Sequence, residues 1–210
     1  MSMKNLLPIL LLIIFISSCK KDELSFTIKG QVSDLTLSGN LSGATVKLYS
    51  FPLGSTLGVF ENSVSTDAQG NYSFELEHDK YEKIQLVLEK GDYFEIIDDI
   101  SFSNLSTTDD NVLNYGMEAK AWTKFIIKNQ QPTSAQDEFK LFKNSGKIDC
   151  AECCNNGYTY YYGAVDTVVY CANGGNRYMS FFYWVNGNED NGNDSVYNTP
   201  FDTTSYEFYY

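Results

Sequence analysis

Four cysteines in the second half of the chain have the spacing that points most directly to chemistry. They are Cys150, Cys153, Cys154 and Cys171, in the pattern C-x2-C-C-x16-C. Four thiolates suit a tetrahedral zinc ion, a C-x-x-C pair can be redox active, and four cysteines in an oxidising compartment form two disulfides. The choice among these chemistries depends on the compartment in which the protein resides.

The first eighteen residues indicate that compartment. Lys4 precedes an apolar run at residues 6–16, and Ser17 and Ser18 follow it. The run is too short to cross a bilayer as a helix, which takes about 20 apolar residues. A positive start, a short apolar stretch and small residues before a break are typical of a removable export signal. We therefore expect residues 1–18 to be a signal peptide.

Cys19 follows the small residues directly, and residues 17–19 resemble the bacterial lipobox. The resemblance implies that Cys19 carries lipid and that residues 19–24 form a lipidated tether to the outer membrane. Several acyl chains hold a protein far more firmly than one. The charged residues at 20–23 (KKDE) resemble the export signal of surface-displayed lipoproteins in Bacteroidota, although a solvated tether has the same composition. We expect display at the cell surface.

Export favours disulfides over zinc or redox chemistry for the four cysteines. Glu152 lies inside the C-x-x-C pair, and a neighbouring acid disfavours the thiolate that redox chemistry requires. A bond between the adjacent Cys153 and Cys154 would be strained, so two connectivities remain open. In one Cys171 pairs with Cys153, and in the other it pairs with Cys154. Neither requires a cofactor, and we expect none.

Residues typical of catalysis are sparse. His78 is the one histidine and lies in a polar stretch, so we expect a surface side chain. The acid pairs Asp98–Asp99 and Asp109–Asp110 could do acid–base work, but adjacent residues on a strand point to opposite faces. We expect solvated turn acids there. The motifs H-E-x-x-H, G-x-S-x-G and G-x-x-x-x-G-K-[ST] do not occur.

An Asn-rich stretch at residues 186–194 offers several oxygen ligands, which calcium prefers. Its calcium candidates are Glu189, Asp190 and Asp194. The spacing is not that of an EF-hand, and a plain hairpin loop is the favoured interpretation.

Three short triplets in the second half resemble the acceptor for O-glycosylation of exported Bacteroidota proteins. They are D-T-V, D-S-V and D-T-T, with Thr167, Ser195 and Thr203 as the acceptors. Such triplets also arise by chance in a Thr-rich β sequence.

Composition excludes one class of partner and indicates the fold class. The net charge is −12, and nucleic-acid binding depends on Lys and Arg that release counterions from phosphates. Eleven of the sixteen tyrosines lie in residues 158–210, and aromatic residues favour strands. Short alternating segments between Gly, Asn and Asp turns predict an all-β protein of two antiparallel β-sandwich modules in tandem, at residues 25–116 and 118–210.

The first module shows this pattern most clearly at residues 72–76, where Tyr72, Phe74 and Leu76 alternate with polar residues after a D-A-Q-G turn. Residues 30–32 (GQV), 43–48 (GATVKL) and 66–74 (TDAQGNYSF) resemble the carboxypeptidase regulatory-like, or transthyretin-like, domain. That family implies a noncatalytic sandwich attached to other modules. Its peptidase activity does not carry over, because no metal-peptidase domain accompanies these residues.

The second module has strands expected at residues 119–129, 138–142, 158–162, 167–171, 178–185 and 206–210. We expect the whole chain to be a noncatalytic binding or assembly module with an unknown protein or glycan ligand. A glycan-binding lipoprotein that uses Tyr and Trp faces of the second module is the first alternative. A hydrolase with dispersed carboxylates is the second, because distant carboxylate pairs leave no motif.

Overall fold

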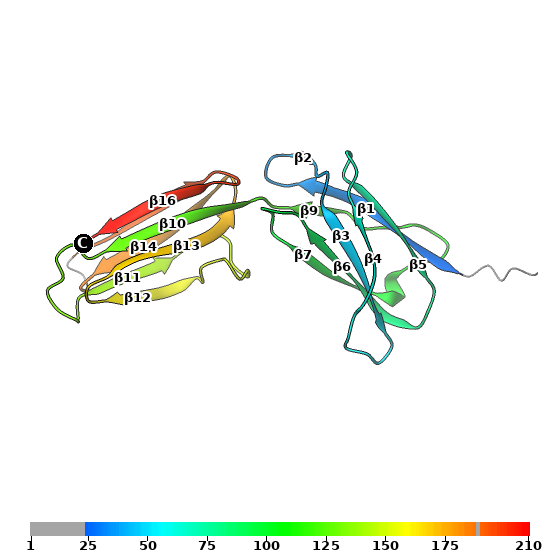
Figure 1. Cartoon of the computed structure of the whole chain (residues 1–210), viewed down its shortest axis with the longest axis horizontal. Helices are drawn as coiled ribbons and strands as arrows, with labels where there is room; N and C mark the ends of the chain where they lie inside the picture. The colour runs from blue at the N-terminus through cyan, green and yellow to red at the C-terminus, as the bar shows by residue number, and fades with distance from the viewer. Residues whose placement is uncertain (1–23, 188–189) are drawn as a thin grey trace, which may run out of the picture.

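The computed structural model describes residues 24–187 and 190–210, and the regular secondary structure of this part is all β-strand apart from one short 3-10 helix (Figure 1). The signal peptide at 1–18, the lipidation prediction for Cys19 and the calcium candidate Glu189 lie outside the described residues. Within those residues, no helix has the length and apolar character needed to cross a membrane. The prediction of an all-β sandwich fold is confirmed.

The first sandwich consists of one mixed sheet, one antiparallel sheet and a short 3-10 helix. One sheet has the order β2-β1-β5, with β8 and β9 added in parallel to β1, and the other has the order β4-β3-β6-β7. The elements are β1 (Ser25–Asp34), β2 (Gly39–Asn40), β3 (Thr45–Pro52), β4 (Val59–Ser65), β5 (Asn71–Glu77), β6 (Tyr81–Glu89), β7 (Ile96–Ser101), η1 (Phe102–Asn104), β8 (Asn111–Val112) and β9 (Tyr115–Met117).

Alternation of apolar and polar residues produces the first core. Tyr72, Phe74 and Leu76 of β5 are buried and face Leu48, Leu86 and other apolar side chains of the opposite sheet. Gly30 in β1 is required by a close backbone approach, because a Cβ there would lie 1.7 Å from the Leu113 carbonyl oxygen. The C-terminal segment of the module therefore packs directly over the first strand.

The second sandwich has one sheet of order β13-β10-β16 and another of order β12-β11-β14-β15. Strands β10 and β16 run parallel, and the other pairs are antiparallel. Its core centres on Phe125, Phe139 and Phe181. The elements are β10 (Lys120–Lys128), β11 (Glu138–Lys143), β12 (Gly157–Tyr162), β13 (Asp166–Gly174), β14 (Arg177–Val185), β15 (Asp190–Asn198) and β16 (Thr203–Tyr209).

Two longer strands differ from what the sequence predicts. Strand β4 was not expected, and most of the Asn-rich stretch at 186–194 belongs to strand β15 rather than to a plain hairpin loop. The Asn-rich residues form a strand because β14 offers them a full ladder of antiparallel partners, from Arg177 opposite Asn198 to Val185 opposite Asp190. Tertiary pairing overrides local propensity at such positions.

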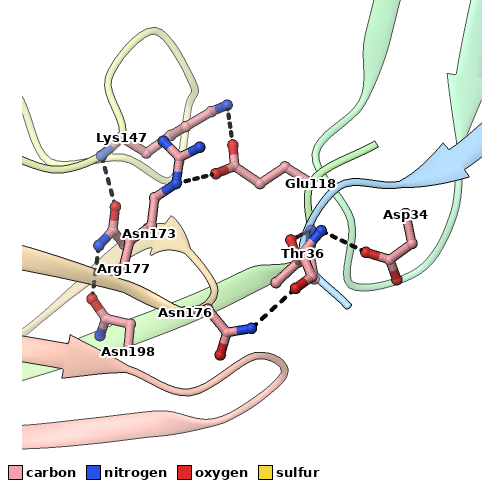
Figure 2. Close-up of polar contacts among 9 residues, drawn as sticks. Asp34, Thr36, Glu118, Lys147, Asn173, Asn176, Arg177 and Asn198 are labelled. Atoms are coloured by element: carbon pink, nitrogen blue, oxygen red, sulfur yellow. Dashed lines mark hydrogen bonds and ion pairs between the residues drawn. The ribbon is translucent and has the colours of Figure 1, made fainter. Parts of the chain in front are cut away.

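Polar contacts join the two sandwiches where the chain passes from β9 to β10 (Figure 2). The Glu118 carboxylate lies 2.7 Å from Lys147 Nζ and 3.1 Å from Arg177 Nε. Asn176 donates from Nδ2 to the Thr36 carbonyl oxygen at 3.0 Å. Phe94 of the first sandwich packs with Cys153, Ala172, Trp122 and Cys150 of the second. The junction therefore combines ion pairs with a small apolar cluster.

Candidate functional site: an aromatic sheet face

The four cysteines of the second sandwich form two disulfides, Cys150–Cys153 and Cys154–Cys171. Of the two connectivities left open by the sequence, the structure has the one in which Cys171 pairs with Cys154. All four sulfurs are thus paired in disulfides. The second bond ties the loop between β11 and β12 to strand β13.

A buried lysine supports this loop from beneath. Lys143 is on the inner face of β11, and its ammonium donates to the carbonyl oxygens of Lys147 and Cys154. Burial lowers the pKa of this lysine because desolvation penalises the charged form. The disulfide loop therefore has a polar attachment to the core as well as a covalent one.

The first acid pair considered for catalysis, Asp98 and Asp99, points in two directions and bonds to different partners. Asp98 and Asp99 lie on strand β7 rather than in a turn, so that interpretation was wrong, and they face opposite sides of the sheet. Asp98 accepts a bond from Tyr115 Oη at 2.7 Å. A bond from Lys83 Nζ lowers the pKa of Asp99. The structure does not bring this pair together for acid–base work.

The other acid pair and the histidine occupy surface positions. Asp110 pairs with Lys29, while Asp109 accepts a hydrogen bond from the Thr108 hydroxyl. His78 is exposed, and its ring stacks on Phe26 at 5.2 Å. It acts as a cover over the edge of the first core.

The two described calcium candidates do not converge. Asp190 and Asp194 are on the same strand, four residues and therefore about 13 Å apart. Asp194 instead accepts from Tyr206 Oη at 2.8 Å, and burial together with this bond raises the pKa of Tyr206 to about 12. Among the described residues no group of three or more His, Cys, Asp or Glu is placed to hold a metal ion.

The three O-glycosylation acceptors differ in accessibility. Ser195 and Thr203 are exposed, whereas Thr167 is half-buried and lies opposite the fully buried Ile127 in the ladder between β13 and β10. An enzyme that modifies folded protein reaches the first two more readily than the third. Their modification stays a prediction.

Aromatic side chains from three strands lie together on the outer face of sheet β12-β11-β14-β15. The register places Tyr158 opposite Phe142 and Phe142 opposite Phe182, and all three side chains point away from the core. Two residues away on each strand, the same register aligns Tyr160, Lys140 and Trp184. We call Phe142, Tyr158, Tyr160, Tyr162, Phe182 and Trp184 the aromatic face.

The rings of the aromatic face form a connected layer. Tyr158 contacts Phe142 with ring centroids 4.8 Å apart and Trp184 at 5.9 Å. Tyr160 and Tyr162 are 6.3 Å apart with planes within 4° of parallel. Despite this packing Tyr158, Tyr160 and Tyr162 keep 56%, 48% and 59% of their surface exposed. The three tyrosines of this layer stay about half-exposed and are therefore available to a ligand.

Polar side chains are interleaved with these rings. Lys140 Nζ lies 4.3 Å from the Trp184 ring centroid and 5.2 Å from that of Tyr158. On the neighbouring strand, Asn191 lies opposite Trp184 and Asn193 lies opposite Phe182. The face thus offers apolar surface together with an ammonium and two amides. Such a mixture suits a ligand with both apolar patches and hydrogen-bonding groups.

The inner face of the same strands has a structural role. Tyr161 and Tyr183 pack beside Phe139 in the core, and burial raises the pKa of Tyr161. The tyrosines of this sandwich therefore divide between core and surface. Only the strand register shows that four further residues share a face with Trp184, so the sequence alone did not identify them. They are Lys140, Phe142, Asn191 and Asn193. The alternation of Tyr158, Tyr160 and Tyr162 was the one available signal.

No protein-family model matches the chain, and no curated protein matches its sequence. Solved structures that align with it include the Bacillus anthracis TIE protein, with 12% identity, a TM-score of 0.37 and coverage of 89% of this chain and 34% of that one. GBS52, the minor pilin of Streptococcus agalactiae, aligns with 9% identity, a TM-score of 0.38 and coverage of 88% and 94%. Catechol 1,2-dioxygenase from Pseudomonas arvilla C-1 aligns with 12% identity, a TM-score of 0.32 and coverage of 50% and 45%.

The chain spans about a third of the length of the TIE protein. All three structures resemble the chain only at low TM-scores. The strand pairing of this chain itself establishes its all-β sandwich fold.

Proposed function

We propose that this protein is a membrane-anchored, noncatalytic binding protein, held at the cell surface by lipid on Cys19, and that the aromatic face is its binding surface. The observation that carries the proposal is the alignment of six aromatic side chains across β12, β11 and β14 on a face that points away from the core. Tyr and Trp are enriched where proteins bind partners, because they supply large contact area with few rotatable bonds.

A glycan is the ligand class that the composition of the face favours. Sugar rings present apolar C–H faces and many hydroxyl groups, and the aromatic face presents rings beside Lys140, Asn191 and Asn193. Rings take the C–H faces, while the ammonium and amides bond to hydroxyls. A protein partner with an apolar patch is the other occupant that such a face accommodates.

A glycan array tests this assignment. The reporter is the mature chain, residues 19–210, with Cys19→Ala and a biotin tag. We expect binding to a subset of glycans, and we expect Trp184→Ala and Tyr160→Ala each to weaken it by about tenfold or more, as loss of a central aromatic contact does. The matched controls are Tyr170→Ala and Tyr209→Ala, two exposed tyrosines of the opposite sheet. These should bind as the parent does.

Binding that is lost equally in Trp184→Ala and Tyr170→Ala would show that the aromatic face is not the site. If no glycan binds, a photo-crosslinking residue at position 160, with position 170 as control, tests for a protein partner on intact cells. Equal crosslinking from both positions would reject the face as a binding surface.

The anchor has its own test. Metabolic labelling with a clickable fatty acid should mark the wild-type protein and spare Cys19→Ala. Equal labelling of the two would contradict lipidation. Protease treatment of intact cells should remove the protein if residues 20–23 direct it to the surface, and protection until lysis would place it on an inner face.

A further inference from the structure

The first sandwich carries an exposed apolar segment that the proposed function does not use. Residues 50–60 connect and flank β3 and β4, and they contain no charged residue in a chain that is 20% charged. Leu53 and Leu57 at its tip are 71% and 77% exposed. Val59 and Phe60 on its second arm are also exposed. Contiguous exposed apolar surface of this kind is typical of a site that contacts a membrane or another protein. We call residues 50–60 the apolar hairpin.

The apolar hairpin is an ordered projection. Ser55 N–H donates to the Pro52 carbonyl oxygen at 2.9 Å, and Leu57 N–H donates to Ser55 Oγ at 3.1 Å. At its base the rings of Tyr49 and Phe60 contact each other with centroids 5.6 Å apart. The leucines at the tip are therefore presented outward by a fixed turn. Figure 1 shows this loop projecting below β3 and β4, clear of the second sandwich.

The hairpin lies beside the point where the chain enters the first sandwich. Leu53 N–H donates to the Lys80 carbonyl oxygen at 2.9 Å, and two residues earlier His78 N–H donates to the Leu24 carbonyl oxygen at 2.8 Å. Leu24 is itself exposed and apolar. Cys19 precedes Ser25 by six residues, so a chain at full extension separates their Cα atoms by at most about 21 Å. Lipid on Cys19 thus keeps this end of the sandwich close to the bilayer.

We propose that the apolar hairpin inserts Leu53 and Leu57 into the outer part of the bilayer beside the lipid on Cys19. The proposal rests on the lipidation stated under the proposed function. An acidic protein is repelled by anionic headgroups. The uncharged hairpin is the part of this end of the first sandwich that is repelled least. A second contact restricts pivoting about the tether and orients the first sandwich on the bilayer.

A vesicle partition experiment tests the hairpin separately from cellular lipidation. The full mature chain, residues 19–210, is made without its signal, so Cys19 carries the one cysteine thiol outside the two disulfides. A single alkyl chain is attached there through a maleimide, because one chain alone gives only marginal binding. Partition into phosphatidylcholine vesicles is measured for the parent and for Leu53→Ser/Leu57→Ser. We expect the double substitution to lower the partition constant by about tenfold or more.

The matched control is Leu35→Ser/Leu37→Ser, since these leucines are 66% and 54% exposed and lie between β1 and β2 near the second sandwich. It should partition as the parent does. Equal partition of all three proteins would overturn the proposal and favour a protein occupant for the hairpin. The alkyl chain is attached chemically, so the vesicle result does not depend on lipidation in cells. Failure of Cys19 labelling in cells would contradict the anchor alone. Circular dichroism confirms that each variant is folded.

Discussion

Cys154 is bonded to Cys171, and this bond fastens the exposed loop before β12 to a buried position of β13 in the neighbouring sheet. The two cysteines are 17 residues apart in sequence. The bond therefore joins the two sheets of the second sandwich covalently as well as by packing.

Replacing Cys154 and Cys171 together with Ala should destabilise the second sandwich. A bridge closing a loop of this size restricts the unfolded chain by about 3 kcal/mol. That is a large part of a typical domain stability of about 5–15 kcal/mol. Denaturant unfolding followed by Trp fluorescence measures the loss. The matched control is Cys150→Ala/Cys153→Ala, whose bridge spans three residues. An equal loss in both pairs would contradict the loop-closure explanation.

Lys143→Met should destabilise the same sandwich without removing a disulfide. The substitution keeps the apolar stem but leaves the carbonyl oxygens of Lys147 and Cys154 without their donor. Unsatisfied buried acceptors cost about 1–3 kcal/mol. Urea unfolding measures the change, with Lys140→Met on the opposite face of β11 as control. A more stable Lys143→Met protein would mean that desolvation of the ammonium outweighs its two bonds.

Asp137→Asn should remove part of the acid sensitivity of folding. The Thr133 N–H, the Thr133 hydroxyl and further donors hold the pKa of Asp137 well below its usual range. The folded pKa is thus lower than the unfolded one, near 3.9. The contribution of Asp137 to stability is complete above that pH and declines as pH falls toward the folded pKa. The urea midpoints of wild type and variant should differ most at pH 7 and converge toward pH 2. A constant gap would exclude this carboxylate as the titrating group.

Glu118→Gln should loosen the junction between the sandwiches (Figure 2). The side chain of Glu118 is only 11% exposed and faces Lys147 and Arg177. Both cations are partly solvated, so we expect a loss of about 1 kcal/mol. Small-angle scattering should show a wider range of orientations, and urea unfolding should show the loss. The control Lys29→Gln breaks the exposed pair with Asp110 and should change neither measurement.

Residues 24–119 should fold alone. Ala119 is buried in the first core and forms a bridge to Tyr93, so the cut must follow it. Circular dichroism and a cooperative thermal transition check this. A random-coil spectrum would show that the first sandwich depends on the second.

Sequence reasoning found the strands whose own residues carry an alternating pattern, such as Tyr72, Phe74 and Leu76. It missed β4, whose side chains are nearly all exposed and therefore show no period of two. It treated most of β15 as loop because Asn, Asp and Gly have low strand propensity, and only pairing with β14 makes them a strand. The sequence indicated Tyr and Trp faces in the second module, but it did not show which residues form the aromatic face, for a related reason. Three strands contribute to it, and register across strands is not encoded in any one of them.

In both sandwiches the first strand pairs in parallel with the last. Strand β1 pairs with β8 and β9, and β10 pairs with β16, where Trp122 is opposite Thr203 and Lys128 is opposite Tyr209. Such non-local closure folds slowly, because the intervening chain must be ordered before the pairing forms. Each sandwich is thus completed only when its final residues emerge. A truncated chain that lacks β16 can complete the first sandwich but not the second, so it exposes the β10 edge to aggregation.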